Sequence, residues 1–170
     1  LLGISIEGHE RFWKISKNLS KISRENWIFA NSTHTIDLIR YFGGNIKKMY
    51  NLSKSYKEKQ GDQFQALFEL NNGTIGNYYS HWYSPGGWSV KLFGEKITVI
   101  FKPLETGVIL DENFKLKKIT PNQYDLRYKP GFYKQAKCFL EMIKYNKIIY
   151  PAQSLEECIK TINIASKLRI

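Results

Sequence analysis

The first two thirds of the chain alternate apolar and polar residues, a pattern that predicts β-strands. In residues 1–10, Ile4 and Ile6 alternate with polar neighbours, as in a strand with one buried face. The alternation returns from residue 46 to about residue 121, where it predicts an antiparallel meander of at least five strands. Between these stretches, residues 16–26 are mostly polar and are expected to form a loop.

Turn signals indicate where the expected strands meet. Asn71-Asn72-Gly73 predicts a hairpin between strands at 63–70 and 74–83, because Asn and Gly accept the positive φ of a tight turn. Phe93-Gly94-Glu95-Lys96 and Asp111-Glu112-Asn113 predict two further turns.

Three segments carry apolar residues at helical spacing. The first, 35–42, is expected to end at Gly43-Gly44, which supplies a left-handed cap. The second follows Pro130, and the third begins at Ser154, where Glu157 completes a capping box. The expected apolar faces are Ile36, Leu38, Ile39 and Phe42; Phe132, Ala136, Phe139, Leu140 and Ile143; and Leu155, Cys158, Ile159, Ile162 and Leu168.

Together these elements predict an α+β fold, a largely antiparallel open-faced sheet with helices packed on one face. No repeat, low-complexity stretch or linker divides the sequence, so residues 1–170 are expected to form a single domain. The sheet face without helices is left for a partner. A homodimer or tetramer through this open face is therefore the expected assembly.

The net charge of the chain adds little to the prediction of its partners. The chain has 26 Lys and Arg against 15 Asp and Glu, and its net charge of +11 favours anionic ligands. The basic residues are dispersed, with pairs at Lys47-Lys48 and Lys117-Lys118 and no long basic run, so no nucleic acid partner is expected. No apolar run approaches the roughly 20 residues that cross a bilayer, so no membrane partner is expected either.

The cysteines and the first residues both favour an intracellular protein. Cys138 and Cys158 lie inside expected helices, which predicts unpaired, buried thiols in a reducing compartment and no metal site. Leu1-Leu2-Gly3 carries neither an initiating Met nor a signal peptide. The sequence is thus expected to continue a longer, cytoplasmic chain.

The densest group of polar residues lies where a helix is expected to begin, at Asn31-Ser32-Thr33-His34-Thr35-Ile36-Asp37. Ordinary capping would account for it, because Ser32 or Thr33 could bond the first free amides and Asp37 could complement the helix dipole. A histidine here is also suited to acid–base catalysis, since histidine exchanges protons near neutral pH. Both interpretations stay open.

From this segment onward the chain resembles the glucose-fructose oxidoreductase, inositol dehydrogenase and rhizopine catabolism (Gfo/Idh/MocA) family. In that family a His-x-x-Asp helix ends in Gly, and an antiparallel sheet with an Asn-Gly hairpin and a Gly-Glu turn follows. Similar features here, in the same order, are His34-Thr35-Ile36-Asp37, Gly43-Gly44, Asn72-Gly73 and Gly94-Glu95. The closing helices of the family resemble Phe132-Tyr133 to Leu140, Pro151 and residues 154–168.

The resemblance implies the C-terminal domain of a two-domain oxidoreductase, which shapes a sugar or nucleotide-sugar pocket and forms the oligomer interface. NAD or NADP would be bound by an N-terminal Rossmann domain. Its Gly-x-Gly-x-x-Gly fingerprint does not occur in this sequence, so no cofactor-binding residue is expected here and the fragment alone is expected to be inactive.

The resemblance also implies a catalytic role for His34. In the family, a Lys of the Rossmann domain and a His of this loop share acid and base duties, and His34 occupies the matching position. The family often has an Asp four residues before the His, where this sequence has Ala30. Asn31 or a substrate group could orient His34 instead.

Six other residues are candidates for contact with a sugar or phosphate. They are Arg24, Trp27, Asn31, His81, Trp82 and Tyr133. Each has an ordinary alternative, because an Arg beside a Trp is often surface packing and aromatic residues of strands are often core or interface.

A second class of function competes with the enzyme. A stand-alone domain could use the open sheet face to dimerise or to hold an acidic partner, without catalysis. Ala30 in place of the family's Asp favours this alternative.

Overall fold

The computed structural model describes the whole chain, residues 1–170. A strand and several short helical segments come first, followed by a longer helix, seven strands and three helices. In chain order the elements are β1 (Gly3–Gly8), α1 (Phe12–Ile15), the 3₁₀ turn η1 (Ser16–Asn18), α2 (Lys21–Glu25), the π-helical turn η2 (Ile28–Ser32), α3 (Thr33–Gly43), β2 (Ile46–Lys54), β3 (Gln63–Leu70), β4 (Ile75–His81), β5 (Trp88–Gly94), β6 (Ile97–Phe101), β7 (Gly107–Asp111), β8 (Leu116–Ile119), α4 (Gln123–Arg127), α5 (Phe132–Tyr145) and α6 (Leu155–Leu168).

All eight strands form one sheet in the order β2-β3-β4-β1-β5-β6-β7-β8. The three expected turns join β3 to β4, β5 to β6 and β7 to β8, so these predictions are confirmed. The expected meander is interrupted once, because β1 enters between β4 and β5 and pairs with β4 in parallel. The fold is α+β with a largely antiparallel, open sheet, as predicted.

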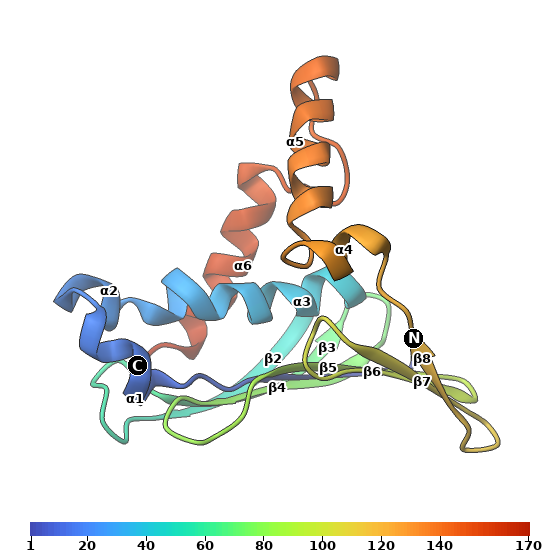
Figure 1. The fold of residues 1–170 in the computed structure, drawn as a ribbon. Helices are drawn as coiled ribbons and strands as arrows, with labels where there is room; N and C mark the ends of the chain where they lie inside the picture. The colour runs from blue at the N-terminus through green and yellow to red at the C-terminus, as the bar shows by residue number, and fades with distance from the viewer.

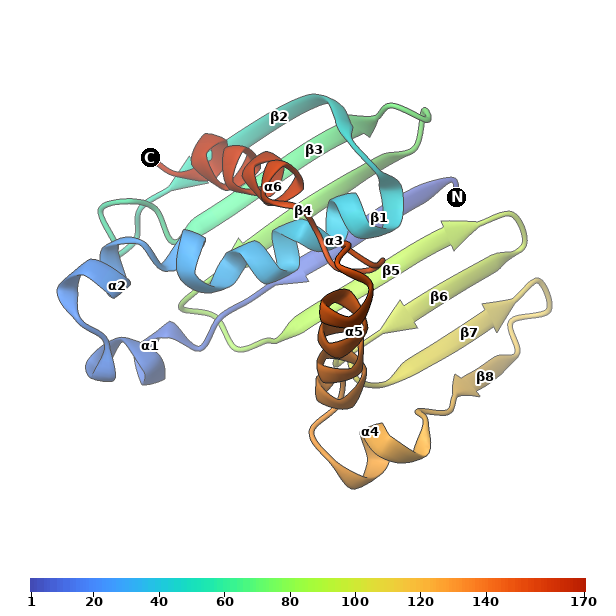
Figure 2. The ribbon, with the colours of Figure 1, turned by 90° about the horizontal axis from the view of Figure 1, so that it is seen from above.

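The helices lie on one side of this sheet, and the opposite face carries no other part of the chain (Figure 1). Seen from above, α3 crosses the middle of the sheet near β1, and α6 lies over β2 and β3 (Figure 2). None of the helices is long and apolar enough to cross a membrane.

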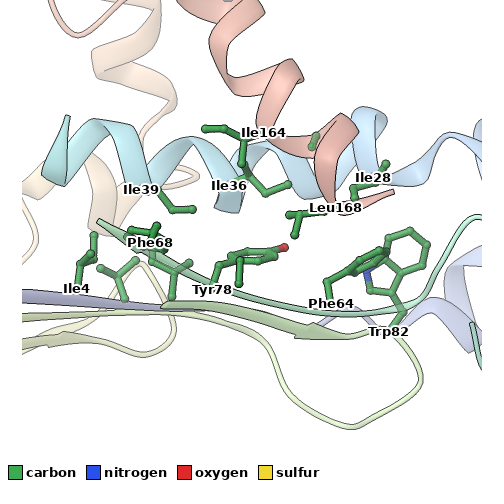
Figure 3. Packing of buried hydrophobic residues seen from close by; sticks show 14 of the residues in the cluster. Ile4, Ile28, Ile36, Ile39, Phe64, Phe68, Tyr78, Trp82, Ile164 and Leu168 are labelled. Carbon is green, nitrogen blue, oxygen red and sulfur yellow. The ribbon is translucent and has the colours of Figure 1, made fainter. Parts of the chain in front are cut away.

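The core fills the space between the sheet and the helices α3 and α6 (Figure 3). Ile4 and Ile6 of β1 face it, as their alternation predicts, and Tyr78 of β4 is almost fully buried beside them. From the helical side, Ile36 and Ile39 of α3 close over these residues. Burial of each such side chain stabilises the fold by roughly 1.5–3 kcal/mol.

The helix containing His34 ends as expected. Gly44 follows α3 with a φ of 85°, a conformation that glycine adopts without a steric penalty. The predicted glycine cap is confirmed.

Polar side chains join α3 to α6. Asp37 accepts hydrogen bonds from Gln153 Nε2, at 2.6 Å, and from Thr161 Oγ1. Arg40, one turn further on, donates to the main-chain oxygen of Glu157 at 2.6 Å. Because α3 begins at Thr33, Asp37 lies beyond the first turn, and the predicted role in the helix dipole is wrong. Its role in the structure is to hold α6.

The expected loop at 16–26 is also wrong. Residues there form η1 and α2, and Ser20 caps α2 by accepting a hydrogen bond from the amide of Ser23 at 3.1 Å. Ser20 was the available signal for a helix start. The segment is polar because α2 buries no residue, and a polar composition predicts a loop.

The predicted apolar faces of the last two helices are largely wrong. No residue of α5 is buried, and α5 stands away from the sheet (Figure 1). In α6 the buried residues are Thr161, Ile164, Ala165 and Leu168, so only Leu168 of the predicted face is buried. The thiols are free as expected, but neither is buried, because Cys138 is partly exposed and Cys158 is exposed. An apolar surface on α5 and α6 therefore remains without a partner in this chain.

Candidate functional site

The candidate site lies at one end of the sheet, where β1 and β4 finish and β5 begins. The turn η2 leads directly into α3 above this end (Figure 2). Gly8, the last residue of β1, lies so close beneath the helix that a Cβ there would be 2.8 Å from Thr35 Oγ1 and 2.5 Å from the hydroxyl of Tyr78. Glycine thus lets the end of β1 approach the first turn of α3.

His34 lies in the first turn of α3 and its side chain is exposed. The ring of Trp88, at the start of β5, lies with its centroid 6.1 Å from that of His34. The preceding π-helical turn is a rare conformation that occurs often at functional sites. His34 is therefore open to a ligand and has an aromatic neighbour.

The polar residues before His34 do not cap the helix. Ser32 makes no capping hydrogen bond to the backbone, and Thr33 Oγ1 donates back to the carbonyl of Phe29 at 3.0 Å. Ser32 Oγ instead donates to Glu10 Oε1 at 3.4 Å, and Asn31 Nδ2 donates to the two carboxylate oxygens of Glu10 at 2.9 and 3.0 Å. The capping interpretation of Ser32 and Thr33 is wrong, because these residues serve other contacts.

Glu10 differs from the other buried acidic residues of the chain. It is 4% exposed and forms no ion pair. Glu7 pairs with Lys102, and Glu58 pairs with Arg24. Asp62 accepts three backbone amide hydrogen bonds instead of a cation. A buried carboxylate without a cation is costly, so its presence suggests a function.

Burial raises the pKa of Glu10 above its ordinary value of 4.5, and hydrogen bonds from Asn31 and Ser32 oppose that shift only in part. The indole N–H groups of Trp88 and Trp27 also favour the charged form of Glu10. The N–H of Trp27 is buried and has no partner within hydrogen-bonding geometry. The side chains that donate to this carboxylate, Asn31 and Ser32, are thus both uncharged.

The raised pKa predicts how stability depends on pH. The folded protein keeps the Glu10 proton where the unfolded chain has lost it, so this stability is complete below pH 4.5 and is lost as the pH rises through the folded-state pKa. Glu10→Gln should therefore gain stability relative to the wild type as the pH rises above about 4.5. Urea unfolding across this range measures the difference. Glu95→Gln, at an exposed site, should show no such trend, and a Glu10→Gln difference independent of pH would contradict the prediction.

A hollow of about 310 Å³ opens beside this carboxylate. Glu10, Arg11 and Trp88 contribute to its wall, with the backbone of Gly86-Gly87 and the loop around Leu104. The hollow thus combines a carboxylate, a guanidinium and an indole, and this indole also lies beside His34.

The structure brings some of the predicted site residues together and separates others. Asn31 contacts Glu10, and Trp27 lies near the same carboxylate. Arg24 forms a two-point hydrogen bond to Glu58, at 2.8 and 2.6 Å, outside this cluster.

The other three lie away from His34. Trp82 is 3% exposed and its ring lies 5.0 Å from that of Phe12, so it is a core residue. His81 faces the open side of the sheet and stacks on His9. Tyr133 lies on α5, stacked on Tyr124 with the ring centroids 3.9 Å apart.

Comparison with known proteins identifies the family. A model of the GFO/IDH/MocA C-terminal domain matches residues 11–100, more than half of the chain. The chain belongs to this family. The resemblance seen around His34 is confirmed, and solved structures extend the shared fold beyond the matched residues.

Three solved structures illustrate the likeness of this GFO/IDH/MocA domain to dehydrogenases. UDP-N-acetylglucosamine 3-dehydrogenase GnnA from Acidithiobacillus ferrooxidans has a TM-score of 0.77 at 15% identity, covering 99% of this chain and 52% of that chain. Levoglucosan dehydrogenase in complex with NADH has a TM-score of 0.79 at 12% identity, covering 98% and 55%. The dehydrogenase MviM from Clostridium difficile has a TM-score of 0.77 at 18% identity, covering 98% and 53%.

Identities this low show the shared fold and nothing about the substrate. The chain spans about half the length of these structures. No curated protein matches its sequence.

Two residues of the candidate site are not evident from the sequence, Glu10 and Trp88. Glu10 follows β1 by two residues, and nothing in the local pattern shows that this end of the strand meets η2. Trp88 follows Gly86-Gly87, and a Trp after two glycines was the one available signal that an aromatic side chain borders an open turn.

Proposed function

We propose that this chain is the substrate-side domain of a two-domain, nicotinamide-dependent oxidoreductase acting on a sugar or nucleotide sugar. The observation that carries the proposal is the exposed His34 of a GFO/IDH/MocA domain, which lies beside Trp88 and follows a turn that is hydrogen-bonded to a buried carboxylate. Related structures include enzymes named for a nucleotide sugar and for levoglucosan.

The apolar surface of α5 and α6 supports the proposal that the enzyme has a second domain. Its exposed members, from 39% to 74%, are Phe132, Phe139, Leu140, Ile143, Leu155, Ile159 and Ile162. Monomeric proteins rarely leave so large an apolar patch in water, and its usual meaning is an interface. We assign this surface to a cofactor domain, since the related structures are about twice as long as this chain.

The residues of this chain do not fit a dinucleotide. Dinucleotide sites place the pyrophosphate on a glycine-rich turn between a strand and the N-terminus of a helix. The β1–α1 connection is the nearest equivalent here, but it carries the Glu10 carboxylate and leads into a helix of four residues. NAD or NADP is therefore assigned to the other domain of the proposed enzyme.

The part of the reaction assigned to this chain is proton transfer. When a sugar hydroxyl becomes a carbonyl, its O–H bond breaks and the proton needs an acceptor. His34 is exposed at the end of the sheet and can accept that proton from a ligand lying against Trp88. Asn31 and Ser32 hold the preceding turn through Glu10 and so position His34.

The test is to extend the coding sequence upstream of Leu1 and to express the longer product. Reduction of NAD or NADP with levoglucosan or a nucleotide sugar should be detectable by absorbance. The 170-residue chain, as a control, should bind no NADH by isothermal titration. Micromolar binding of NADH to this chain, or a longer product without a dinucleotide-binding fingerprint, would overturn the proposal.

We further propose that the open sheet face forms a homo-oligomer. It carries a broad apolar hollow of about 680 Å³, lined in part by Tyr50, Leu67, Ile75 and Phe93. Leu67 is 64% exposed on β3 and Ile75 is 65% exposed on β4. Exposed apolar residues on a flat sheet suit a self-complementary dimer, in which each surface meets its own copy.

Leu67→Glu should weaken this dimer, because a symmetric interface would bury two added carboxylates near each other. The dissociation constant is expected to rise at least about tenfold. Sedimentation equilibrium measures it. Leu126→Glu, on exposed α4 away from this face, should leave the constant unchanged. A monomeric wild type, or an unaltered constant in Leu67→Glu, would contradict the assignment.

A second candidate is a binding domain without catalysis. Ala30, exposed in η2, leaves His34 without the carboxylate that the family often places there. Lack of turnover by a longer product that binds NADH and a sugar would favour this alternative.

A further inference from the structure

A hollow of about 270 Å³ lies where α6 passes over β2, beside the C-terminal half of α3 (Figure 2). None of the nine residues that line it is acidic. Its polar lining consists of Arg40 from α3, Asn45 from the loop that follows, Lys47 from β2, and Lys160, Asn163 and Lys167 from α6. Segments far apart in the sequence thus bring four cations and two amides together, and we call this place the basic hollow.

Arg40 is held in place with one edge of its guanidinium weakly bonded. Its side chain is only 7% exposed, and Nη1 donates to the main-chain oxygen of Glu157 at 2.6 Å and to Thr161 Oγ1 at 3.1 Å. Nη2 also donates to the Glu157 carboxylate. On the edge formed by Nε and Nη2, the shared acceptor is the neutral Asn45 Oδ1, at 3.4 and 3.3 Å. Arginine binds phosphate through such an edge by two parallel bonds, so an anion in place of this amide would bond more strongly.

The three lysines of the basic hollow are able to turn toward a ligand. Lys167 forms no ion pair with a carboxylate of the chain. Lys47 pairs with Glu69 and Lys160 pairs with Glu157, but these four side chains are 33–53% exposed. Exposed ion pairs add little stability because water screens them, so a more highly charged ligand can replace them.

Nearby carboxylates lower the positive charge of the basic hollow without cancelling it. Asp37 Oδ1 lies 3.8 Å from Arg40 Nη1, and Glu69 and Glu157 are the other neighbours. Four cations thus meet three carboxylates, none of which lines the hollow. A phosphate group suits this arrangement better than a carboxylate, because its oxygens point in several directions and the cations come from three elements of the fold.

We propose that the basic hollow binds the phosphate group of a small molecule or free phosphate, between Arg40 of α3, Lys47 of β2, and Lys160 and Lys167 of α6. The bound group connects α6 to both α3 and β2, and it stabilises the folded chain by mass action. The inference goes beyond the proposed function and does not depend on it, since it involves no sugar, no nicotinamide cofactor and no contact with His34.

Isothermal titration of the 170-residue chain tests the site, at about pH 8, where phosphate is a dianion, and at an ionic strength held constant with NaCl. The probes are inorganic phosphate, pyrophosphate and glycerol 3-phosphate. Pyrophosphate should bind with a dissociation constant of about 1 mM or less, and acetate should bind at least about tenfold more weakly. Tighter binding of glycerol 3-phosphate than of inorganic phosphate would support an organic phosphate as the ligand, and the reverse order would support free phosphate.

Lys167→Gln should weaken pyrophosphate binding at least about fivefold, because a charge-assisted hydrogen bond is lost. Lys160→Gln is a second variant with the same expectation. Lys117→Gln is the matched control, since it removes the same charge from an exposed residue of β8, at the opposite edge of the sheet from β2. Its dissociation constant should stay within about twofold of the wild type. Thermal unfolding without added anion checks that each variant is folded.

Three results would overturn the inference. The first is the absence of pyrophosphate binding at about 10 mM. The second is unchanged binding in both Lys167→Gln and Lys160→Gln. The third is an equal loss in Lys117→Gln and Lys167→Gln, which would show that the net charge of the chain attracts the anion without a specific site.

Discussion

Replacing His34 by alanine is expected to lower kcat of the proposed two-domain enzyme by about 10²–10⁴-fold, the usual contribution of a positioned general base. The reason is that the other two imidazoles of the chain, those of His9 and His81, are stacked on each other, and Nδ1 of His9 accepts a hydrogen bond from the amide of His81. His81 points to the open sheet face, where it stacks on His9. KM should change by less than about threefold, because the base acts on the proton during the reaction and adds little to ground-state binding.

The measurement is steady-state kinetics on the longer product with each sugar that it oxidises. Tyr41→Ala is a suitable control, because Tyr41 is 45% exposed on the same helix and about two turns further on. Its kcat should remain within about twofold of the wild type. A His34→Ala enzyme that keeps kcat within about threefold would remove His34 from the chemistry.

How much of the fold could be predicted depends on how local each pattern is. The hairpin at Asn71-Asn72-Gly73 and the cap at Gly44 follow from the conformations of single residues, and both were predicted. The insertion of β1 beside β4 was not, because Ile4 meets Gly76 through pairing that no local sequence encodes.

The helices at the end of the chain show a different limit. The helical spacing of apolar residues identified α5 and α6 as helices. In the folded chain, however, no residue of α5 is buried. A hydrophobic stripe shows that a helix face needs a partner, and it does not show that the partner belongs to the same chain. In α6, Ile164 and Leu168 are buried while Leu155 is 74% exposed, so one helix presents apolar residues in two directions.

Local sequence identifies only part of the candidate site, whose function stays a prediction. His34 and Asn31 were found because they lie in one polar segment. Glu10 can be recognised as a site residue only in the folded chain, where η2 contacts the residues that follow β1. Its lack of a cationic partner is likewise a property of the folded chain alone. Trp82 was a candidate for stacking on a sugar, and its burial in the core agrees with the alternative of an ordinary aromatic residue of a strand.

Phe12→Ala is expected to cause the largest loss of stability among the substitutions considered, about 3–5 kcal/mol. Phe12 begins α1 and is fully buried, at 0% exposure. Its ring lies 5.0 Å from that of Trp82 and 5.6 Å from that of Trp27. Alanine would leave a cavity among rigid aromatic rings, which cannot collapse to fill it.

The same substitution should affect the site, because Phe12 fixes the segment that carries Glu10. Its amide donates to the carbonyl of Trp82 at 3.0 Å, and the aromatic contacts hold this short helix against the end of the sheet. Urea unfolding measures the loss. Phe114→Ala, at a residue that is 83% exposed, should change stability by less than about 0.5 kcal/mol. A loss below about 1 kcal/mol for Phe12→Ala would show that α1 is not anchored by its ring, and the position of Glu10 would then need another cause.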